Sequence, residues 1–357
     1  MRLLLTGANG FLGWHLKCLN LALYKHEITD WNRFSQAVSI PQPPFDMVLH
    51  LASRMRGTDH EIYHDNFEVT DNLIQTMKSM GSPSTLVHAN SIQSGNDSAF
   101  GLAKAEMSDR LKQECKALGW QYNEILFPNI FGERAIPNHN SFVATAIESL
   151  IHGIKFDIFD RELDLVYAQD AARLLLEPNL GFDSLESVSV KSSVSEVFYK
   201  LRDLNDAYVQ NEIPAIDSHL SLALFNSLRF AIGPKRILLS NKGDKRGSLF
   251  ELANFKGNSS TVFASDTEKS CSRGNHFHME KFERFIVLSG RGQIVTRELF
   301  TDQLEVIHVD GASPIAVDIP TFTAHKLVND GADKLFGVFI SSPAFENERP
   351  DTYRVDV

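Results

Sequence analysis

The chain has 357 residues, of which 43% are apolar, so it can bury sizeable cores and is long enough for two domains. Its formal net charge of −10 offers no basic surface to a polyanion, which excludes a general binder of nucleic acid or acidic membranes. Three scattered cysteines, no signal peptide and no apolar run of about 18 residues predict a soluble, cytoplasmic protein without a disulfide framework.

From residue 1 to about residue 176, short apolar runs alternate with segments of helical spacing. This alternation is typical of β-α-β units. It predicts an α/β fold, a Rossmann-type doubly wound parallel sheet covered by helices. The expected strands are residues 3–6, 26–31, 47–52, 86–91 and 122–127.

A glycine-rich turn joins the first expected strand to the first expected helix. Glycines there permit a tight turn and close approach of the backbone, so that a pyrophosphate can bind the free N–H groups at the helix start. We therefore predict dinucleotide binding, with a purely structural turn as the alternative. The cofactor-binding residues of this turn are Gly7, Asn9, Gly10, Phe11, Leu12 and Gly13.

The end of the second expected strand bears on the choice of cofactor. Asp30 would favour the ribose hydroxyl of NAD, whereas Arg33 would accommodate the 2′-phosphate of NADP. Because both residue types are present, NADH stays open. Arg33 leads us to expect NADPH.

The loop TGANGFLG, the HLA sequence at residues 50–52 and PNIFG at residues 128–132 resemble extended short-chain dehydrogenases that act on nucleotide sugars. The resemblance implies that Leu51 and Ala52 line the cofactor site. It also implies that Ser91 orients the substrate carbonyl. A tyrosine then exchanges the proton, while Lys104 holds the nicotinamide ribose and lowers the pKa of the tyrosine.

The tyrosine position is occupied by Phe100. Phenylalanine has no ionisable hydroxyl, so a reductase that depends on it should lose on the order of a hundred- to ten-thousandfold in rate. Three explanations stay open: a catalytically silent domain, a substitute acid, or a deliberate inactivating change. In the alternative without a catalytic role, Ser91 is an ordinary strand-end serine and Lys104 is a helix-surface lysine.

Residues 177–232 mix short helical pieces, which suit a substrate cap followed by a linker. After Gly233-Pro234, closely spaced strands follow without helices, a pattern typical of a sandwich or small barrel. We therefore expect residues 1–234 to form the NAD(P)-binding domain with its cap, and residues 235–357 to form a metal-binding, all-β domain.

Four residues of the second domain suit a metal. His276 and His278 stand two residues apart, which places them on one face of a strand, and Glu283 and His325 add a carboxylate and a third imidazole. This set suits Zn²⁺, Fe²⁺, Mn²⁺ or Ni²⁺, of which we expect zinc. The isolated histidines are interpreted as packed or surface residues: His15, His50, His88, His152 and His308.

The two histidine-bearing segments resemble the paired motifs of cupins, with Phe322 in place of the glycine usual in the second. The resemblance implies a cupin barrel. Lys281 occupies the position of a lysine in the family's first motif and is an acid/base candidate. The alternative is a solvated lysine at a strand end.

The order of the two domains, with NSFVAT at residues 140–145, GDKRGSLFEL at 243–252, RGNHFH at 273–278 and PDTY at 350–353, resembles bifunctional capsular polysaccharide enzymes of the CapF type. The resemblance implies that the cupin epimerises C3 of a UDP-linked 4-keto-6-deoxy amino sugar. The dehydrogenase part then reduces C4 with NADPH, giving a 6-deoxy-L-talosamine nucleotide on the route to N-acetyl-L-fucosamine.

We expect a homodimer. Two other functions remain open at this point. In one, the dehydrogenase part only binds the nucleotide sugar and the cupin alone is catalytic, which Phe100 favours. In the other, the protein is a non-catalytic sugar-binding subunit of a polysaccharide pathway.

Overall fold

The structure is a computed structural model that describes residues 1–31, 45–80, 84–177, 182–239, 253–255, 260–342 and 350–357. Contacts divide the chain into two compact units. The first unit holds residues 1–131 and 162–192, and the second holds residues 132–161 and 193–357. Residue 234, the expected end of the first domain, lies within the second unit.

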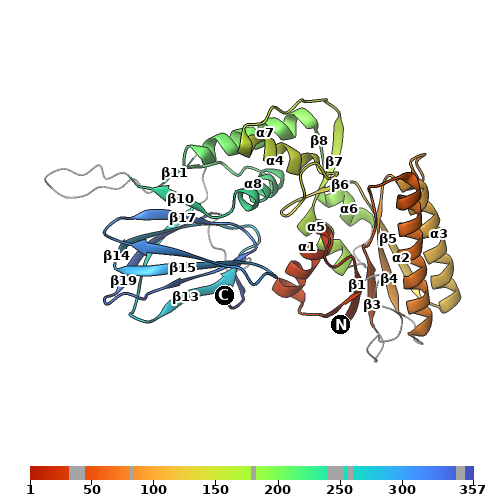
Figure 1. Ribbon diagram of the computed structural model, residues 1–357, viewed down its shortest axis with the longest axis horizontal. Helices are drawn as coiled ribbons and strands as arrows, with labels where there is room; N and C mark the ends of the chain where they lie inside the picture. The colour runs from red at the N-terminus through yellow and green to blue at the C-terminus, as the bar shows by residue number, and fades with distance from the viewer. Residues whose placement is uncertain (32–44, 81–83, 178–181, 240–252, 256–259, 343–349) are drawn as a thin grey trace. The chain divides into compact units, whose positions relative to one another are not determined.

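The first unit is built on a five-stranded parallel sheet with the strand order β2-β1-β3-β4-β5 (Figure 1). The order reverses between β1 and β3, and the crevice beyond the carboxyl ends of strands at such a point is where α/β sheets bind ligands. The predicted Rossmann-type sheet is confirmed. Its strands are β1 (Arg2–Thr6), β2 (Glu27–Trp31), β3 (Met47–His50), β4 (Thr85–Ser91) and β5 (Gln121–Phe127).

Helices cover the sheet because its strands are apolar on both faces. Helices α2 (Asp59–Ser79) and α3 (Ala99–Leu118) lie on one face, where Leu73, Leu86 and Leu111 belong to one buried cluster. On the other side of the sheet lie α1 (Phe11–Leu19) and α5 (Ala168–Leu176) (Figure 1). The remaining elements of this unit are the π-helix η1 (Asn20–Tyr24), β6 (Asn129–Phe131), β7 (Glu162–Tyr167), α6 (Phe182–Val188) and most of β8 (Ser189–Ser193).

The second unit contains two five-stranded sheets, with the orders β10-β17-β14-β19-β12 and β16-β15-β18-β13-β20. The pairings within both sheets are antiparallel, and one buried cluster draws apolar side chains from both, among them Phe285, Ile294 and Leu327. The β-rich C-terminal part predicted from the sequence is therefore confirmed. The strands are β10 (Lys235–Leu238), β12 (Thr261–Thr267), β13 (Ser272–Phe277), β14 (Phe282–Ser289), β15 (Arg291–Glu298), β16 (Leu304–Asp310), β17 (Ile315–Ile319), β18 (Thr323–Val328), β19 (Leu335–Ser342) and β20 (Tyr353–Arg354).

Helices belong to this second unit as well. They are α4 (Phe142–His152), α7 (Val194–Val209) and α8 (His219–Ile232), and a short parallel pair joins β9 (Glu212–Ile213) to β11 (Asn254–Phe255). Of the segment expected to form a cap and linker, residues 193–232 are thus packed in one unit with the β-sheets, whereas the part before residue 193 belongs to the first unit. Across the described ranges, the helices are too short or too polar to cross a membrane.

Candidate functional site

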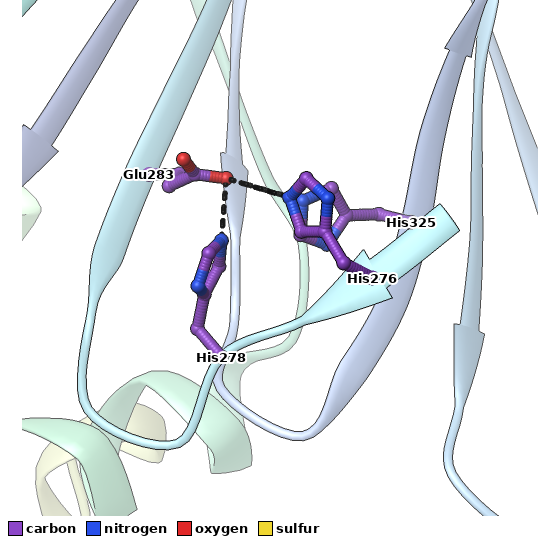
Figure 2. Close-up of side chains that lie close together, drawn as sticks. All are labelled: His276, His278, Glu283 and His325. Carbon is purple, nitrogen blue, oxygen red and sulfur yellow. Dashed lines mark hydrogen bonds and ion pairs between the residues drawn. The ribbon is translucent and has the colours of Figure 1, made fainter. Parts of the chain in front are cut away.

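Three imidazoles and a carboxylate converge in the second unit (Figure 2). Their ligand atoms all lie within 4.8 Å of one another. Glu283 Oε2 lies 3.0 Å from His278 Nε2, 3.1 Å from His325 Nε2 and 4.0 Å from His276 Nε2. The four residues that the sequence indicated as metal ligands therefore meet at one point.

Three different elements position this quartet. His276 lies on β13, Glu283 on β14 and His325 on β18, while β13 ends at Phe277, so that His278 stands in the turn that follows. The expectation that both motif histidines share one strand face is therefore wrong for His278. The register shift of β13 before His276 and the turn after Phe277 bring both rings to the site.

Backbone carbonyls define which nitrogen each buried histidine presents. His278 Nδ1 contacts the carbonyl of Asp351, and His325 Nδ1 lies 2.9 Å from the carbonyl of Thr323. A carbonyl can only accept, so Nδ1 carries the proton and Nε2 presents a lone pair when the ring is neutral. Two such lone pairs facing the Glu283 carboxylate repel it unless a cation or a proton lies between them. Neutral imidazoles and a carboxylate are a suitable donor set for a divalent transition metal.

The carboxyl group of Glu283 is ionised, which is the form that binds a cation. Burial by itself raises the pKa of this carboxyl. When the imidazoles are protonated on Nε2, the charge of His278 and the hydrogen bonds from the three rings hold the pKa well below its usual range, and a bound cation would take the place of these protons. Glu283 is therefore a carboxylate. The residues present fit a bound divalent cation.

The turn between β13 and β14 is held by the C-terminal segment. The carboxylate of Asp351 accepts hydrogen bonds from three successive backbone N–H groups, those of Met279 (3.1 Å), Glu280 (3.0 Å) and Lys281 (2.8 Å). Together with the Asp351 carbonyl at His278, these bonds orient the turn that separates two of the candidate ligands. A lone aspartate gave no signal for this role in the sequence.

Helix α8 supports the same turn from within the second unit. Asn226 Nδ2 donates to the carbonyl of Met279 at 3.3 Å, and Arg229 Nη2 lies 3.5 Å from the carbonyl of Glu280. Both side chains are buried. The helix that the sequence placed in a cap or linker thus helps to shape the candidate metal site.

Lys281 is buried, and its ammonium donates to the carbonyl of Pro350 at 3.0 Å. The alternative interpretation of a solvated lysine is therefore wrong, because the C-terminal segment covers this side chain. Its role as an acid or base stays a prediction.

Phe322 explains why glycine is usual at its position. Its φ of 56° lies in the left-handed region, which costs a bulky residue about 1–3 kcal/mol. The residue is fully buried, and its N–H donates to the carbonyl of His278 at 2.8 Å. Packing and this hydrogen bond hold the strained backbone beside the candidate ligands.

In the first unit, the glycine turn packs against the backbone that follows β3. A Cβ atom at Gly7 would lie 2.8 Å from the Ala52 nitrogen, and one at Gly13 would lie 2.3 Å from the Gly7 oxygen. Gly7 also has a φ of 71°. Both positions thus require glycine, and together they hold the start of α1 beside the carboxyl ends of β1 and β3, where a dinucleotide phosphate fits.

The predicted cofactor residues around this turn lie where a Rossmann cofactor site needs them. The N–H groups of Leu51 and Ala52 both donate to the Thr6 hydroxyl at 3.1 Å, which ties the end of β3 to the end of β1. Asn9 and Gly10 are exposed in the turn, and Phe11 and Leu12 open α1.

Asp30 lies near the end of β2 and forms an ion pair with Lys17 at 3.4 Å. That position is the one from which an acidic residue contacts the adenosine ribose. Arg33 lies outside the described residues, so the preference for NADPH stays a prediction.

Of the three hydride-transfer positions, Ser91 ends β4, and Phe100 and Lys104 lie on α3 one helical turn apart. Lys104 is buried, which makes the helix-surface alternative wrong. Its Nζ donates to the carbonyl of Ala89 at 3.1 Å and lies 3.4 Å from His88 Nε2. Burial lowers the pKa of Lys104 to about 8.

His50 and His88, interpreted from the sequence as ordinary packed or surface residues, are both buried within this region. His50 Nδ1 lies 2.8 Å from the Thr6 hydroxyl, and His88 Nδ1 lies 3.0 Å from the hydroxyl of Tyr122. Burial lowers the pKa of His50 to about 3, and nearby Lys104 adds to this effect. The strands bury neutral imidazoles that the sequence did not single out.

Comparisons with known proteins define the class of this chain. Residues 3–177 match the NAD dependent epimerase/dehydratase family, and residues 242–353 match the polysaccharide biosynthesis C-terminal domain. The two parts of the chain are thus similar to an epimerase/dehydratase family and to a domain of polysaccharide biosynthesis proteins.

Relatives are similar over the whole chain. A curated relative from Pseudomonas aeruginosa, UDP-2-acetamido-2,6-beta-L-arabino-hexul-4-ose reductase, is 27% identical over 100% of this chain and 99% of its own length. The crystal structure of the capsular polysaccharide assembling protein CapF from Staphylococcus aureus shares the fold over 100% of both chains, with a TM-score of 0.59 and 24% identity. A structure of CapF with the inhibitor 3-isopropenyl-tropolone is similar over 100% of both chains, with a TM-score of 0.52 and 23% identity. The resemblance to the CapF type that the sequence indicated is confirmed.

Proposed function

We propose that this protein modifies a UDP-linked 4-keto-6-deoxy-N-acetylhexosamine in two steps, epimerisation at C3 and NADPH-dependent reduction at C4. The observation that carries the proposal is the quartet of His276, His278, Glu283 and His325, of which the last three are buried, in a chain that also matches an epimerase/dehydratase family. The product would be UDP-N-acetyl-6-deoxy-L-talosamine. Functionally, residues 1–234 would carry the reduction and residues 235–357 the epimerisation.

For the epimerisation, we propose that residues 235–357 form a cupin barrel with zinc held by the quartet. A divalent metal, when bound there, supplies Lewis-acid polarisation of a substrate oxygen. The C4 ketone makes the C3 proton acidic, so a base on one face of the sugar and an acid on the other complete the inversion. Lys281 is our candidate for one of these groups, because it lies in the turn between two ligands and is buried there.

For the reduction, we propose that the turn around Gly7 and Gly13 binds NADPH, which supplies the hydride. Ser91, at the carboxyl end of β4, would hydrogen-bond the C4 carbonyl and orient it. The Pseudomonas aeruginosa relative is a reductase of a UDP-linked 4-ulose, which supports the same class of substrate. Polysaccharide biosynthesis, the subject of the C-terminal family match, is a process that consumes such nucleotide sugars.

A second candidate is an epimerase whose first unit binds the nucleotide sugar without reducing it. Phe100 favours this candidate, since no phenol stands at the usual proton-donor position.

One experiment separates these candidates. The protein is incubated with the UDP-linked 4-keto sugar in D₂O, with and without NADPH, and both deuterium at C3 and NADPH oxidation are followed. We expect both signals. Deuterium exchange without NADPH oxidation would select the second candidate, and the absence of both would leave a non-catalytic sugar-binding protein.

A further inference from the structure

The buried polar groups around Lys104 form a continuous hydrogen-bonded chain inside the first unit. His88 Nε2 lies 3.4 Å from Lys104 Nζ, and His88 Nδ1 lies 3.0 Å from the Tyr122 hydroxyl. That hydroxyl contacts Ser108 Oγ at 3.0 Å, and Ser108 donates to Glu124 Oε1 at 2.6 Å. The chain leads from a buried ammonium to a carboxylate whose side chain is 26% exposed.

The donors and acceptors of this chain are consistent along its length. An ammonium only donates, so His88 Nε2 accepts from Lys104 and the imidazole proton lies on Nδ1. The Tyr122 hydroxyl then accepts from Nδ1–H and donates to Ser108, which donates to Glu124. A neutral imidazole is the form that burial favours, because burial and the neighbouring Lys104 hold the pKa of His88 well below its usual value.

The ammonium also lies near the turn of α3 where the family has its tyrosine. Lys104 follows Phe100 by one helical turn, and long helical side chains lean toward the preceding turn. Its Nζ contacts the carbonyl of Ala89, two residues before Ser91 on β4. Within the described residues, the contacts with His88 and Ala89 use two of its three N–H groups, and the third suits a substrate oxygen.

We propose that Lys104 is the proton donor of the ketone reduction, in place of the tyrosine that Phe100 replaces, and that the chain from His88 through Tyr122 and Ser108 to Glu124 holds its ammonium in position. The inference rests on the reductase proposed above. It gives the first unit a substitute acid, so that the absence of the phenol does not make the unit silent.

Reduction of a ketone to an alcohol consumes one hydride and one proton. The carbonyl carbon receives a hydride as NADPH is oxidised to NADP⁺, the π electrons move to oxygen, and the oxygen takes a proton from Lys104 Nζ. The neutral amine regains a proton from solvent after the product has left. The arrangement observed, with every hydrogen directed toward Glu124, keeps His88 Nε2 as an acceptor for the ammonium before and after this step.

The basicity of the amine suits this role. An acid works best when its pKa lies near the working pH, and burial lowers the pKa of Lys104 to about 8. The titratable groups that face Lys104 are His50 from β3, His88 from β4 and Glu124 from β5. Both histidines are neutral at pH 7, so Glu124 is the charged group that raises its pKa.

The first test observes Lys104 without any reaction. Nuclear magnetic resonance of lysine side chains, assigned with Lys104→Gln, should show one lysine that titrates near pH 8. In Tyr122→Phe, His88 Nδ1–H loses the hydroxyl at 3.0 Å and is left with the more distant Glu124 Oε1 at 3.6 Å, so that the tautomer with Nε2–H is populated more and Lys104 loses an acceptor in turn. We expect its pKa to fall by about half a unit or more. Tyr24→Phe, which removes a hydroxyl bonded to Glu177 on the other side of the sheet, is the matched control and should leave this titration unchanged.

The second test follows reduction of the keto sugar against pH. Because the protonated amine is the donor, the rate should fall as the pH rises through about 8, and in Tyr122→Phe the fall should begin at lower pH. We also expect a tenfold lower kcat in Tyr122→Phe at pH 7.5, with NADPH affinity equal to that of Tyr24→Phe, and a loss of at least a hundredfold in Lys104→Gln.

Different results would overturn the proposed reductase and the proposed role of Lys104 as proton donor. If the unaltered protein binds NADPH but does not reduce the sugar, the proposed reductase is overturned and this inference with it. If reduction proceeds and survives Lys104→Gln, or if Lys104 titrates near the usual value for lysine and ignores Tyr122→Phe, the reductase stands and this inference alone is overturned. Thermal unfolding of each variant shows whether a loss of rate reflects misfolding.

Discussion

The candidate metal quartet of the second unit and the Lys104 region of the first unit are both largely buried polar sites, but they are built differently. The quartet consists of residue types that bind metals, at spacings that the sequence displays, and all four meet within 4.8 Å. The Lys104 region has Phe100 where the dehydrogenases that the sequence resembles have a tyrosine, and its buried partners are residues that no motif marks. A sequence motif therefore locates a site well when the motif residues themselves form the site. It locates a site poorly when residues of neighbouring strands supply the interacting groups.

Among the predictions for the quartet and for the Lys104 region, the largest expected effect is loss of the metal from the quartet. His278→Ala should weaken binding of zinc by at least a hundredfold and abolish C3 exchange, since it removes one of four ligands. Metal analysis after dialysis and competition with a chelator measure the affinity. His308→Ala, which removes an exposed histidine of β16, is the control. Full metal content in His278→Ala would show that the quartet is not the ligand set.

Asp351 tests whether the C-terminal segment is part of the metal centre. Asp351→Ala removes the acceptor for the N–H groups of Met279, Glu280 and Lys281, so the turn that carries His278 loses its orientation. We expect 10- to 100-fold weaker zinc binding, as is typical when a supporting contact of a metal site is lost. The exposed Asp356 provides a control, because Asp356→Ala should bind zinc as tightly as the unaltered protein if the effect is specific.

Phe100→Tyr tests the Lys104 region, which the sequence motif locates less completely than the quartet. The new phenol would stand one turn before Lys104, whose ammonium lowers a neighbouring phenol's pKa, so NADPH-dependent ketone reduction should rise at least about tenfold. Stopped-flow measurement of NADPH oxidation records the change, and Phe67→Tyr on α2 serves as the control. An unchanged and readily measured rate would mean that residue 100 does not limit proton transfer.

The smallest expected effect concerns the cofactor. Calorimetric titration should show severalfold tighter binding of NADPH than of NADH, because Arg33 would pair with the 2′-phosphate. Arg33→Ala should remove the difference while NADH binding stays the same. Tighter binding of NADH by the unaltered protein would identify Asp30 as the selecting residue instead.

Much of the fold followed from local patterns. Strands 3–6, 26–31 and 86–91 were predictable because apolar runs of that length between helical segments form buried parallel strands, and β1, β2 and β4 confirm them. The division into units was not predictable from the sequence. Helix α8 has a sequence pattern that suits a cap helix, but it packs with the C-terminal sheets. Helical periodicity shows that a helix has an apolar face and does not show what that face contacts.

The sequence by itself determined the ligand types and their order, His276, His278, Glu283 and His325, and the glycines of the nucleotide turn, because metal ligation and close backbone approach each demand particular residues. Only the tertiary structure decided that Asp351 holds the metal turn and that Lys281 and Lys104 are buried. It also decided that His88, Tyr122, Ser108 and Glu124 form one chain. These contacts join strands and segments far apart along the chain, so no local spacing records them, and burial, which depends on packing of the whole unit, makes Lys104 an acid with a pKa of about 8.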